Sequence, residues 1–262
     1  MTLKVDTDIE QSSITGTINL ADLDGTDGFL MMGEDAGDLF GIDVSTAGDV
    51  NGDGFEDIIV GASEGGSSGN TGVAYVIFGK ADGFSLVESI AAVSAGDGTT
   101  GFELLGEANG DQAGIAVSGA GDVNGDGFAD VIVGAQTANS NTGAAYIVFG
   151  AASFASSYAL GALSSNGFII DGTVANERFG TSVAAGGDID GDGFDDVIIG
   201  APGSTSSQAG AAYILYGSSG LGSDITSSAL GEHISGIDAE DKAGYRVDGI
   251  GDINGDGLDD VL

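Results

Sequence analysis

A string rich in Asp, Asn and Gly occurs four times along the chain, and it constrains the fold more than any other feature. It reads GDVNGDGFEDIIVGA from Gly48, GDVNGDGFADVIVGA from Gly121, GDIDGDGFDDVIIGA from Gly187 and GDINGDGLDDVL from Gly251. The first Asp residues of successive copies are separated by 73, 66 and 64 residues. A period of this size indicates an array of similar units, each packed against its neighbours.

Each unit reads as four short strands joined by turns. In the first unit these strands are expected near residues 40–47, 57–62, 73–78 and 101–105, where Val, Ile, Tyr and Phe are bounded by Gly, Asn, Asp and Ser. The second strand is continuously apolar, which is typical of a strand buried on both faces. We therefore predict an all-β fold, a β-propeller of four-stranded blades.

The repeats divide the chain into a lead-in segment, 1–27, and a propeller region, 28–262. Within that region the Asp-rich loops occupy 49–57, 122–130, 188–196 and 252–260. Three units are complete, and the fourth stops inside its second strand at Leu262. Because a propeller typically needs 4–8 blades to close, we expect the chain to be a fragment of a longer propeller, truncated at its C-terminus.

The charge balance excludes several classes of function. The chain has 41 acidic and 5 basic residues, a formal net charge of -36, which leaves no basic surface for nucleic acid. Anionic membranes would repel it, and it contains no uninterrupted apolar stretch of the length that inserts directly into a bilayer. There is no cysteine and no visible N-terminal signal peptide. Bound cations would relieve the self-repulsion of such a chain.

The Asp-rich loops have the oxygen spacing of a calcium site. In the first loop, side-chain oxygens fall at positions 1, 3, 5 and 9, a backbone carbonyl is available at 7, and Gly54 at position 6 permits a sharp turn. An EF-hand is excluded because position 12 is apolar and the flanks are strands rather than helices. A plain turn sequence, magnesium and zinc are weaker alternatives, since four copies share the ninth-position Asp and zinc would lack its His and Cys ligands.

We do not expect an enzyme. The one histidine, His233, lies in an expected outer strand, and Tyr75, Tyr146 and Tyr213 recur at one place per unit, which indicates packing. Arg178 and Arg246 could grip a carboxylate, but pairing with the many local acids is the simpler expectation. Three loops end in an acid pair, Glu56-Asp57, Asp195-Asp196 or Asp259-Asp260, which resembles glycosidase carboxylates only superficially, because its second member is already a proposed ligand.

The combination of an FG pair, the DxNxDGxxD loop and an apolar strand ending in GA or GAP resembles the FG-GAP repeat of integrin alpha propellers. The FG pair appears as Phe40-Gly41 and Phe179-Gly180, and the full GAP appears as Gly200-Ala201-Pro202. The resemblance implies a seven-bladed propeller with one calcium ion for each loop. It implies about four Ca²⁺ sites here, with these ligands: Asp49, Asn51, Asp53, Phe55 and Asp57; Asp122, Asn124, Asp126, Phe128 and Asp130; Asp188, Asp190, Asp192, Phe194 and Asp196; Asp252, Asn254, Asp256, Leu258 and Asp260. Phe55, Phe128, Phe194 and Leu258 would act through their carbonyl oxygens.

The resemblance also implies adhesion or extracellular ligand recognition, at the cell surface or in the extracellular space. A protein or glycan ligand is expected on the variable inter-strand loops, 64–71, 136–142 and 203–209, because binding residues concentrate on loops. Two alternatives remain open. The chain could be a non-catalytic accessory domain of a larger secreted enzyme, or a structural surface repeat without a specific ligand.

Overall fold

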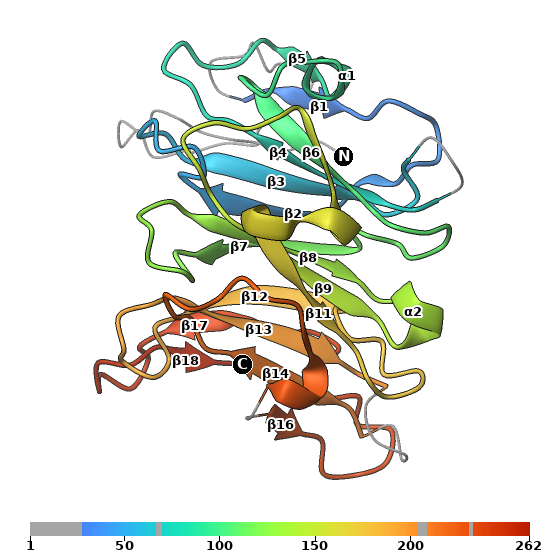
Figure 1. Cartoon of the computed structure of the whole chain (residues 1–262), viewed down its shortest axis with the longest axis vertical. Helices are drawn as coiled ribbons and strands as arrows, with labels where there is room; N and C mark the ends of the chain where they lie inside the picture. The colour runs from blue at the N-terminus through green and yellow to red at the C-terminus, as the bar shows by residue number, and fades with distance from the viewer. Residues whose placement is uncertain (1–27, 67–69, 204–208, 231–232) are drawn as a thin grey trace, which may run out of the picture.

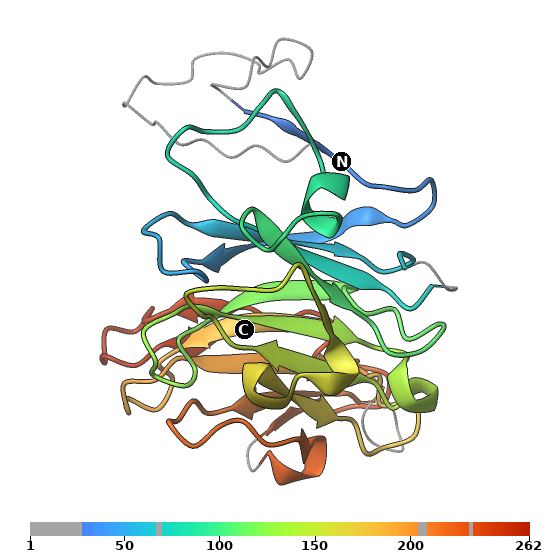
Figure 2. The same ribbon diagram turned by 45° about the horizontal axis from the view of Figure 1, so that its top comes forward.

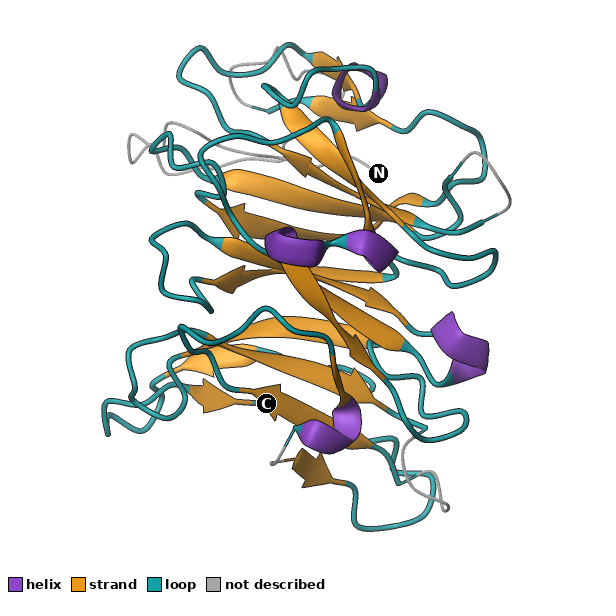
Figure 3. Cartoon of the chain, in the orientation of Figure 1, coloured by secondary structure: helices purple, strands orange, loops and turns teal. Residues whose placement is uncertain are grey.

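The computed structural model describes residues 28–66, 70–203, 209–230 and 233–262. The fold is all-β, as expected: strands dominate and the few helices are single turns (Figure 3). Successive sheets are stacked face to face in chain order, as the two views agree (Figures 1 and 2). This arrangement is that of consecutive blades in part of a β-propeller.

The strands of each blade follow the expected bounds closely. Blade 1 contains β2 (Phe40–Gly48), β3 (Asp57–Ala62), β4 (Val73–Ile77) and β6 (Gly101–Leu105). Blade 2 contains β7 (Ala116–Gly121), β8 (Asp130–Ala135), β9 (Ala144–Val148) and β11 (Gly167–Asp171). Blade 3 contains β12 (Ser182–Gly187), β13 (Asp196–Ala201), β14 (Ala211–Leu215) and β16 (His233–Ser235), and blade 4 contributes β17 (Gly249–Gly251) and β18 (Asp260–Val261).

Neighbouring strands within a blade run antiparallel, and the first strands of successive blades lie next to one another. The strands β2, β7, β12 and β17 therefore form the inner row of the stack. The first two strands of each blade also slip in register just before the Asp-rich loop, for example between Gly119 and Gly121. This irregularity turns the chain out of the sheet and into the loop.

A short parallel strand pairs with the edge of a neighbouring strand at three places, which the sequence did not reveal. The stretch β5 (Val87–Ser89) pairs with β1 (Leu30–Met32), β10 (Ser157–Ala159) pairs with β6, and β15 (Ile225–Thr226) pairs with β11. Each of these strands lies in the connection between the third and fourth strands of one blade but joins the fourth strand of the preceding blade. The connections therefore tie neighbouring blades together through backbone hydrogen bonds.

The core lies between the sheets. All six residues of β8 and of β13 are buried, which confirms the prediction that the second strands are covered on both faces. The third strands β4, β9 and β14 are buried along their whole length as well. Tyr75, Tyr146 and Tyr213 on these strands are at most 8% exposed, which confirms their expected packing role.

The recurring GA and FG glycines meet between blades. Within blade 2, the carbonyl oxygen of Gly134 near the end of β8 accepts from the Gly114 N–H at 3.0 Å, and within blade 3 Gly200 accepts from Gly180 in the same way. The contact between blades is a different one: a Cβ on Gly134 of blade 2 would lie well within 3.0 Å of the Gly180 carbonyl oxygen of blade 3. The FG glycines themselves have positive φ values, such as 81° at Gly114. The two halves of the repeat motif are therefore conformational requirements of one inter-blade contact.

Three helical turns, α1 (Ala91–Ser94), η2 (Leu160–Ala162) and η3 (Ser164–Asn166), cover the outer ends of the sheets. The others are α2 (Ala138–Asn141) and η4 (Ser227–Ala229). Among the described residues, every helix is far too short to cross a membrane.

Candidate metal centre

The four Asp-rich loops connect the first strand of each blade to the second, so they lie at the same end of every sheet. The glycine at position 6 of every loop adopts φ of 91–92°, in the left-handed region. A Cβ there meets nothing within 4 Å, so glycine is needed for its backbone conformation alone. The loop turns sharply at this residue, as the sequence predicted.

The side-chain oxygens of each loop are folded toward its own backbone. In the second loop, the Asp122 carboxylate accepts hydrogen bonds from the backbone N–H groups of Gly125, Asp126 and Gly127 at 2.7–3.0 Å. The Asn124 Oδ1 atom accepts from Asp126 N at 2.8 Å, and Asp126 Oδ1 accepts from Phe128 N at 3.0 Å. The other three loops repeat this pattern almost atom for atom.

The ninth-position Asp is the anchor between loop and sheet. Asp130 is 0% exposed, and its two oxygens accept from Val123 N at 3.0 Å and from Gly150 N at 2.8 Å. Asp57 and Asp196 are equally buried and make equivalent pairs of bonds. Asp260 accepts from Ile253 N at 3.0 Å and is only half-buried.

These buried carboxyl groups are in an unfavourable environment when no cation is near. Burial, together with the nearby Asp126 and Asp122 carboxylates, raises the pKa of Asp130 to about 7, although two backbone N–H donors oppose the shift. Burial likewise raises the pKa of Asp57 to about 6 and that of Asp196 to about 6. A buried anion beside two other anions is the electrostatic condition that a divalent cation would relieve.

The third loop brings three acids together most closely. One oxygen from each of Asp188, Asp190 and Asp196 lies within 4.8 Å of the others, and no other group of three metal-ligating acids, His or Cys occurs in the described part of the chain. The remaining loops have an Asn in place of Asp190, so an amide oxygen takes the place of one carboxylate. The donor set of every loop is therefore hard oxygen, which fits calcium.

The seventh-position residues have a second role that the sequence did not indicate. The ring of Phe128 packs where a Cβ on Gly52 of the preceding loop would stand, and Phe194 lies in the same way against Gly125. The close neighbour of the position-4 glycine is therefore the aromatic ring of the next blade. The ligand role of the seventh-position carbonyl oxygens stays a prediction.

The eighth position also links one loop to the next. The N–H groups of Ala129, Asp195 and Asp259 donate to the carbonyl oxygens of Asp49, Asp122 and Asp188, the first residue of each preceding loop, at 3.1–3.3 Å. The carboxylates of Asp195 and Asp259 also accept the N–H of Asp122 at 2.7 Å and of Asp188 at 3.0 Å. Asp195 and Asp259, the first members of two acid pairs, are thus structural, and only an inter-blade contact could have revealed this role.

We expect the calcium-free protein to become more stable as pH falls from 7.5 to 5. Because the folded-state pKa of Asp130 is about 7 and its ordinary value is 3.8, the folded state binds more protons between these values. Its contribution to stability is present at low pH and is lost as pH rises through 7. Scanning calorimetry in chelator should show a melting temperature higher by about 5 °C at pH 5.

The Asp130→Asn variant is the control for that pH series. The melting temperature of this variant should change less with pH than that of the original chain. The part of the change that comes from general repulsion between acidic residues should be the same in both. With calcium present the slope should reverse, since protons compete with the metal for the same oxygens. A calcium-free melting temperature that falls on acidification would contradict the assignment of these raised pKa values.

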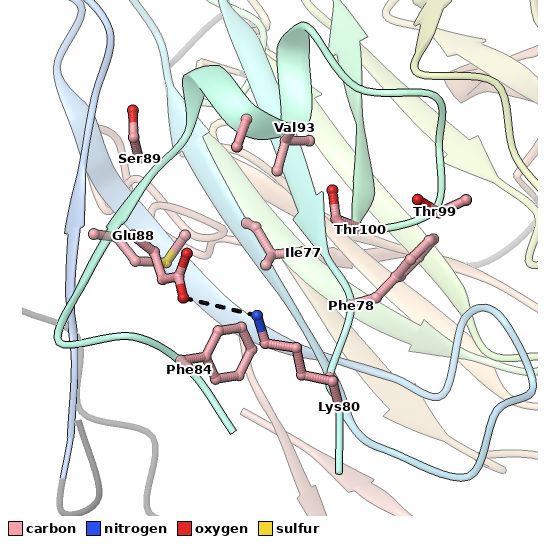
Figure 4. Close-up of a pocket in the computed structure, with 12 residues that line it drawn as sticks. Ile77, Phe78, Lys80, Phe84, Glu88, Ser89, Val93, Thr99 and Thr100 are labelled. Atoms are coloured by element: carbon pink, nitrogen blue, oxygen red, sulfur yellow. Dashed lines mark ion pairs between the residues drawn. The ribbon is translucent and has the colours of Figure 1, made fainter. Parts of the chain in front are cut away.

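A separate hollow of about 120 Å³ lies in blade 1 (Figure 4), and Gly79 in its lining donates its N–H to Asp57 of the first Asp-rich loop at 2.8 Å. Its walls include Ile77, Phe84 and Val93, and the Lys80 ammonium lies 4.6 Å from the Phe84 ring centre. Lys80 Nζ is also 3.7 Å from Glu88 Oε1. Lys80 is the one cation in the lining of this hollow and is already paired with Glu88, so the Lys80–Glu88 contact closes the edge of blade 1. His233 lies elsewhere, in β16, stacked on the Tyr213 ring at 5.4 Å.

Comparison with known proteins accounts for the repeated architecture. The FG-GAP repeat model matches residues 40–77, 113–148 and 179–215. Integrin alpha-PS5 of Drosophila melanogaster is 34% identical over 176 residues, which are 65% of this chain and 16% of that protein. Integrin alpha-2 of Bos taurus is 40% identical over 96 residues, and integrin alpha pat-2 of Caenorhabditis elegans is 36% identical over 85, each alignment covering about a third of this chain and 7% of the relative.

The chain therefore spans at most 16% of the length of these relatives. Each matched repeat runs from the first strand of a blade to its third and includes one Asp-rich loop. The inter-blade glycine contact explains why FG and GA recur together. This chain is an FG-GAP repeat protein, similar in sequence to integrin alpha chains.

Proposed function

We propose that the chain is a calcium-binding, integrin-alpha-like propeller module for adhesion or extracellular ligand recognition, and that it is not an enzyme. One observation carries this proposal: a buried carboxylate with a raised pKa recurs at the same place in three successive blades, beside two or three further oxygen side chains. Similarity to integrin alpha chains supports the recognition role. Calcium is abundant outside cells, which favours an extracellular location.

The ion would be held by the oxygens at positions 1, 3, 5, 7 and 9 of each loop. It would supply positive charge between carboxylates that now accept backbone N–H groups. The chain prepares the site in two ways. The glycine at position 6 turns the loop, and the ninth-position Asp fixes it to the second strand through bonds such as Asp57 Oδ2 to Val50 N at 2.9 Å.

We expect the third loop to bind calcium most tightly, because its four acids provide one more negative charge than the other loops. The Asp190→Asn variant makes this loop like the others, and Asn124→Asp adds the missing carboxylate to the second loop. Titration calorimetry should show the tightest binding phase weakened about tenfold in the first variant. In the second variant a further tight phase should appear. An unchanged tightest phase in Asp190→Asn would refute the ranking.

Ligand recognition would use the ends of the sheets opposite the Asp-rich loops. The second strands begin at the loops and end at the variable stretches 64–71, 136–142 and 203–209, of which the structure describes 64–66, 70–71, 136–142, 203 and 209. Six residues of strand separate the two ends by about 20 Å. Calcium would therefore stiffen the blades without touching the ligand.

The recognition role is tested by displaying the calcium-loaded chain to protein and glycan arrays. We expect retention that is lost when the variable stretches are exchanged for Gly-Ser segments. Failure to retain any ligand would favour a purely structural surface repeat. Turnover of a retained polysaccharide by the chain itself would overturn the non-enzymatic assignment.

A further inference from the structure

Three of the four basic residues that the structure describes, Arg178, Lys242 and Arg246, gather on one face. The structure describes four of the five Lys and Arg residues. Among these four, Lys80 is the one that forms an ion pair with an acid, Glu88. Arg178, Lys242 and Arg246 have no ion-pair partner within the described residues, so the expectation that the two arginines pair with local acids is wrong for that part of the chain. Three unpaired cations in a chain of net charge -36 require an explanation.

The three cations line two adjoining hollows, which lie at the ends of the sheets opposite the Asp-rich loops. The first hollow, about 250 Å³, is lined by Arg178, Arg246, Gln136, Thr181 and Tyr245 among others. Its wall includes Ile42, Ile115, Thr181 and Tyr245, which follow the FG glycine in each of the four blades. All four blades therefore contribute to it, and it lies beside the inner row of strands. The second hollow, about 300 Å³, shares Arg178, Pro202 and Tyr245 and adds Asn176 and Lys242.

The cations break the repeat at this face. Arg178 and Lys242 occupy the position that is Leu39 in blade 1 and Gln112 in blade 2, and all four have left-handed backbone with φ of 55–59°. Arg246 occupies the position that is Asp43, Ala116 and Ser182 in the other blades. Repeated packing residues would be alike, whereas residues that differ in type at a fixed backbone position are typical of binding.

Neutral polar groups beside the cations are held in place. Gln136 Nε2 donates to Gln112 Oε1 at 3.0 Å, and Thr181 Oγ1 lies 2.7 Å from the Arg178 carbonyl oxygen, to which it donates. The Arg246 guanidinium lies 5.9 Å from the centre of the Tyr245 ring, which is 59% exposed. The face thus combines two guanidiniums, fixed hydroxyl and amide groups, and an accessible aromatic ring.

We propose that this face binds the carboxylate of an acidic sugar carried by an otherwise neutral glycan. Arg178 and Arg246 hold the carboxylate, because guanidinium forks match its two oxygens. Thr181, Gln136 and Asn176 meet sugar hydroxyls, and the Tyr245 ring covers the apolar side of a sugar. The proposal rests on the recognition role above and names the chemistry of its ligand.

The overall charge selects a ligand with few negative charges. A strongly acidic protein or polymer would be repelled by the surrounding carboxylates at any distance within about 10 Å. A single carboxylate on a neutral oligosaccharide meets little of this repulsion and gains the local contact with the two guanidiniums. This favours a glycan with one acidic unit over an acidic protein partner.

The test uses the calcium-loaded chain with sialyllactose, which has one carboxylate, and lactose, which has none. Saturation-transfer NMR and titration should show binding of sialyllactose but not of lactose. Arg178→Gln and Arg246→Gln should each weaken the binding about tenfold, the expected loss for one charged hydrogen-bonded contact. Glucuronate alone serves as a second probe, to distinguish a free acid from one presented by a glycan.

The matched control is Lys80→Gln, which changes the net charge equally but lies at the outer edge of blade 1. It should bind sialyllactose like the original chain, and all variants should keep their melting temperature in calcium. Equal weakening in Lys80→Gln would show a general charge effect and overturn the site. Preference for an acetylated Asp peptide over sialyllactose would overturn the sugar assignment.

The same variants separate this proposal from the recognition role. If protein or glycan arrays retain the chain and both arginine variants are retained equally, recognition stands and the carboxylate site is refuted. If the arrays retain nothing and sialyllactose does not bind, both proposals fail.

Discussion

Chelation of calcium should lower the melting temperature of the chain by about 20 °C or more. At free calcium 100-fold above the dissociation constant, each site stabilises the folded state by about 2.7 kcal/mol, so three or four sites contribute about 8–11 kcal/mol. For a chain of this size, 1 kcal/mol corresponds to about 2–4 °C. Removing the ions also leaves the buried Asp57, Asp130 and Asp196 without a compensating charge.

Scanning calorimetry with and without chelator measures this shift. Magnesium at the same concentration should restore only part of it, since its octahedral demand fits a many-oxygen loop less well. Replacing the four first-position Asp residues by Asn should abolish the calcium response while leaving the strands intact by circular dichroism. An unchanged melting temperature on chelation would remove the basis for the metal sites.

The second large effect is expected from Gly134→Ala. The added Cβ would overlap the Gly180 carbonyl oxygen of the next blade, and both atoms are backbone-fixed, so no side chain can turn aside. Overpacking of this kind costs about 3 kcal/mol, and it would separate the blades at the contact that joins FG and GA. The melting temperature should therefore fall by about 6–12 °C.

Gly220→Ala is the matched control, because a Cβ there has nothing within 4 Å and the residue is outside the left-handed region. It should leave the melting temperature within about 1 °C of the original. Gly61→Ala and Gly200→Ala repeat the test in blades 1 and 3, where the same contact occurs. If the Gly134→Ala and Gly220→Ala variants have the same melting temperature, the inter-blade glycine contact does not limit the stability of the fold.

The repeat made most of the fold predictable. The expected strands 57–62 and 101–105 agree with β3 and β6, because local composition and turn residues define them. The parallel strands such as Val87–Ser89 were missed, because a short, partly polar stretch becomes a strand only when another blade supplies its partner. Their pairing depends on tertiary structure rather than on sequence pattern.

The candidate site divides in the same way. The turn at Gly54 and the anchoring Asp57 follow from the spacing of residues within one loop. The requirement for glycine at Gly52 and the role of Asp195 do not follow from the spacing within one loop. Each depends on a contact with an atom of a neighbouring blade. The clustering of Arg178 and Arg246 was equally hidden, since the residues are far apart in sequence and meet only where four blades converge.

The parallel strands have a consequence for biosynthesis. Blade 1 begins at Phe40, but its sheet gains its last strand only when Ala159 has been made. At about 5–20 residues per second, that interval is roughly 6–24 s. During this interval the sheet of blade 1 has an unpaired edge beside its apolar third and fourth strands. Each nascent blade is therefore complete only after part of the next blade has been synthesised. A ribosome that stalls between two blades would expose the edge that the finished stack conceals.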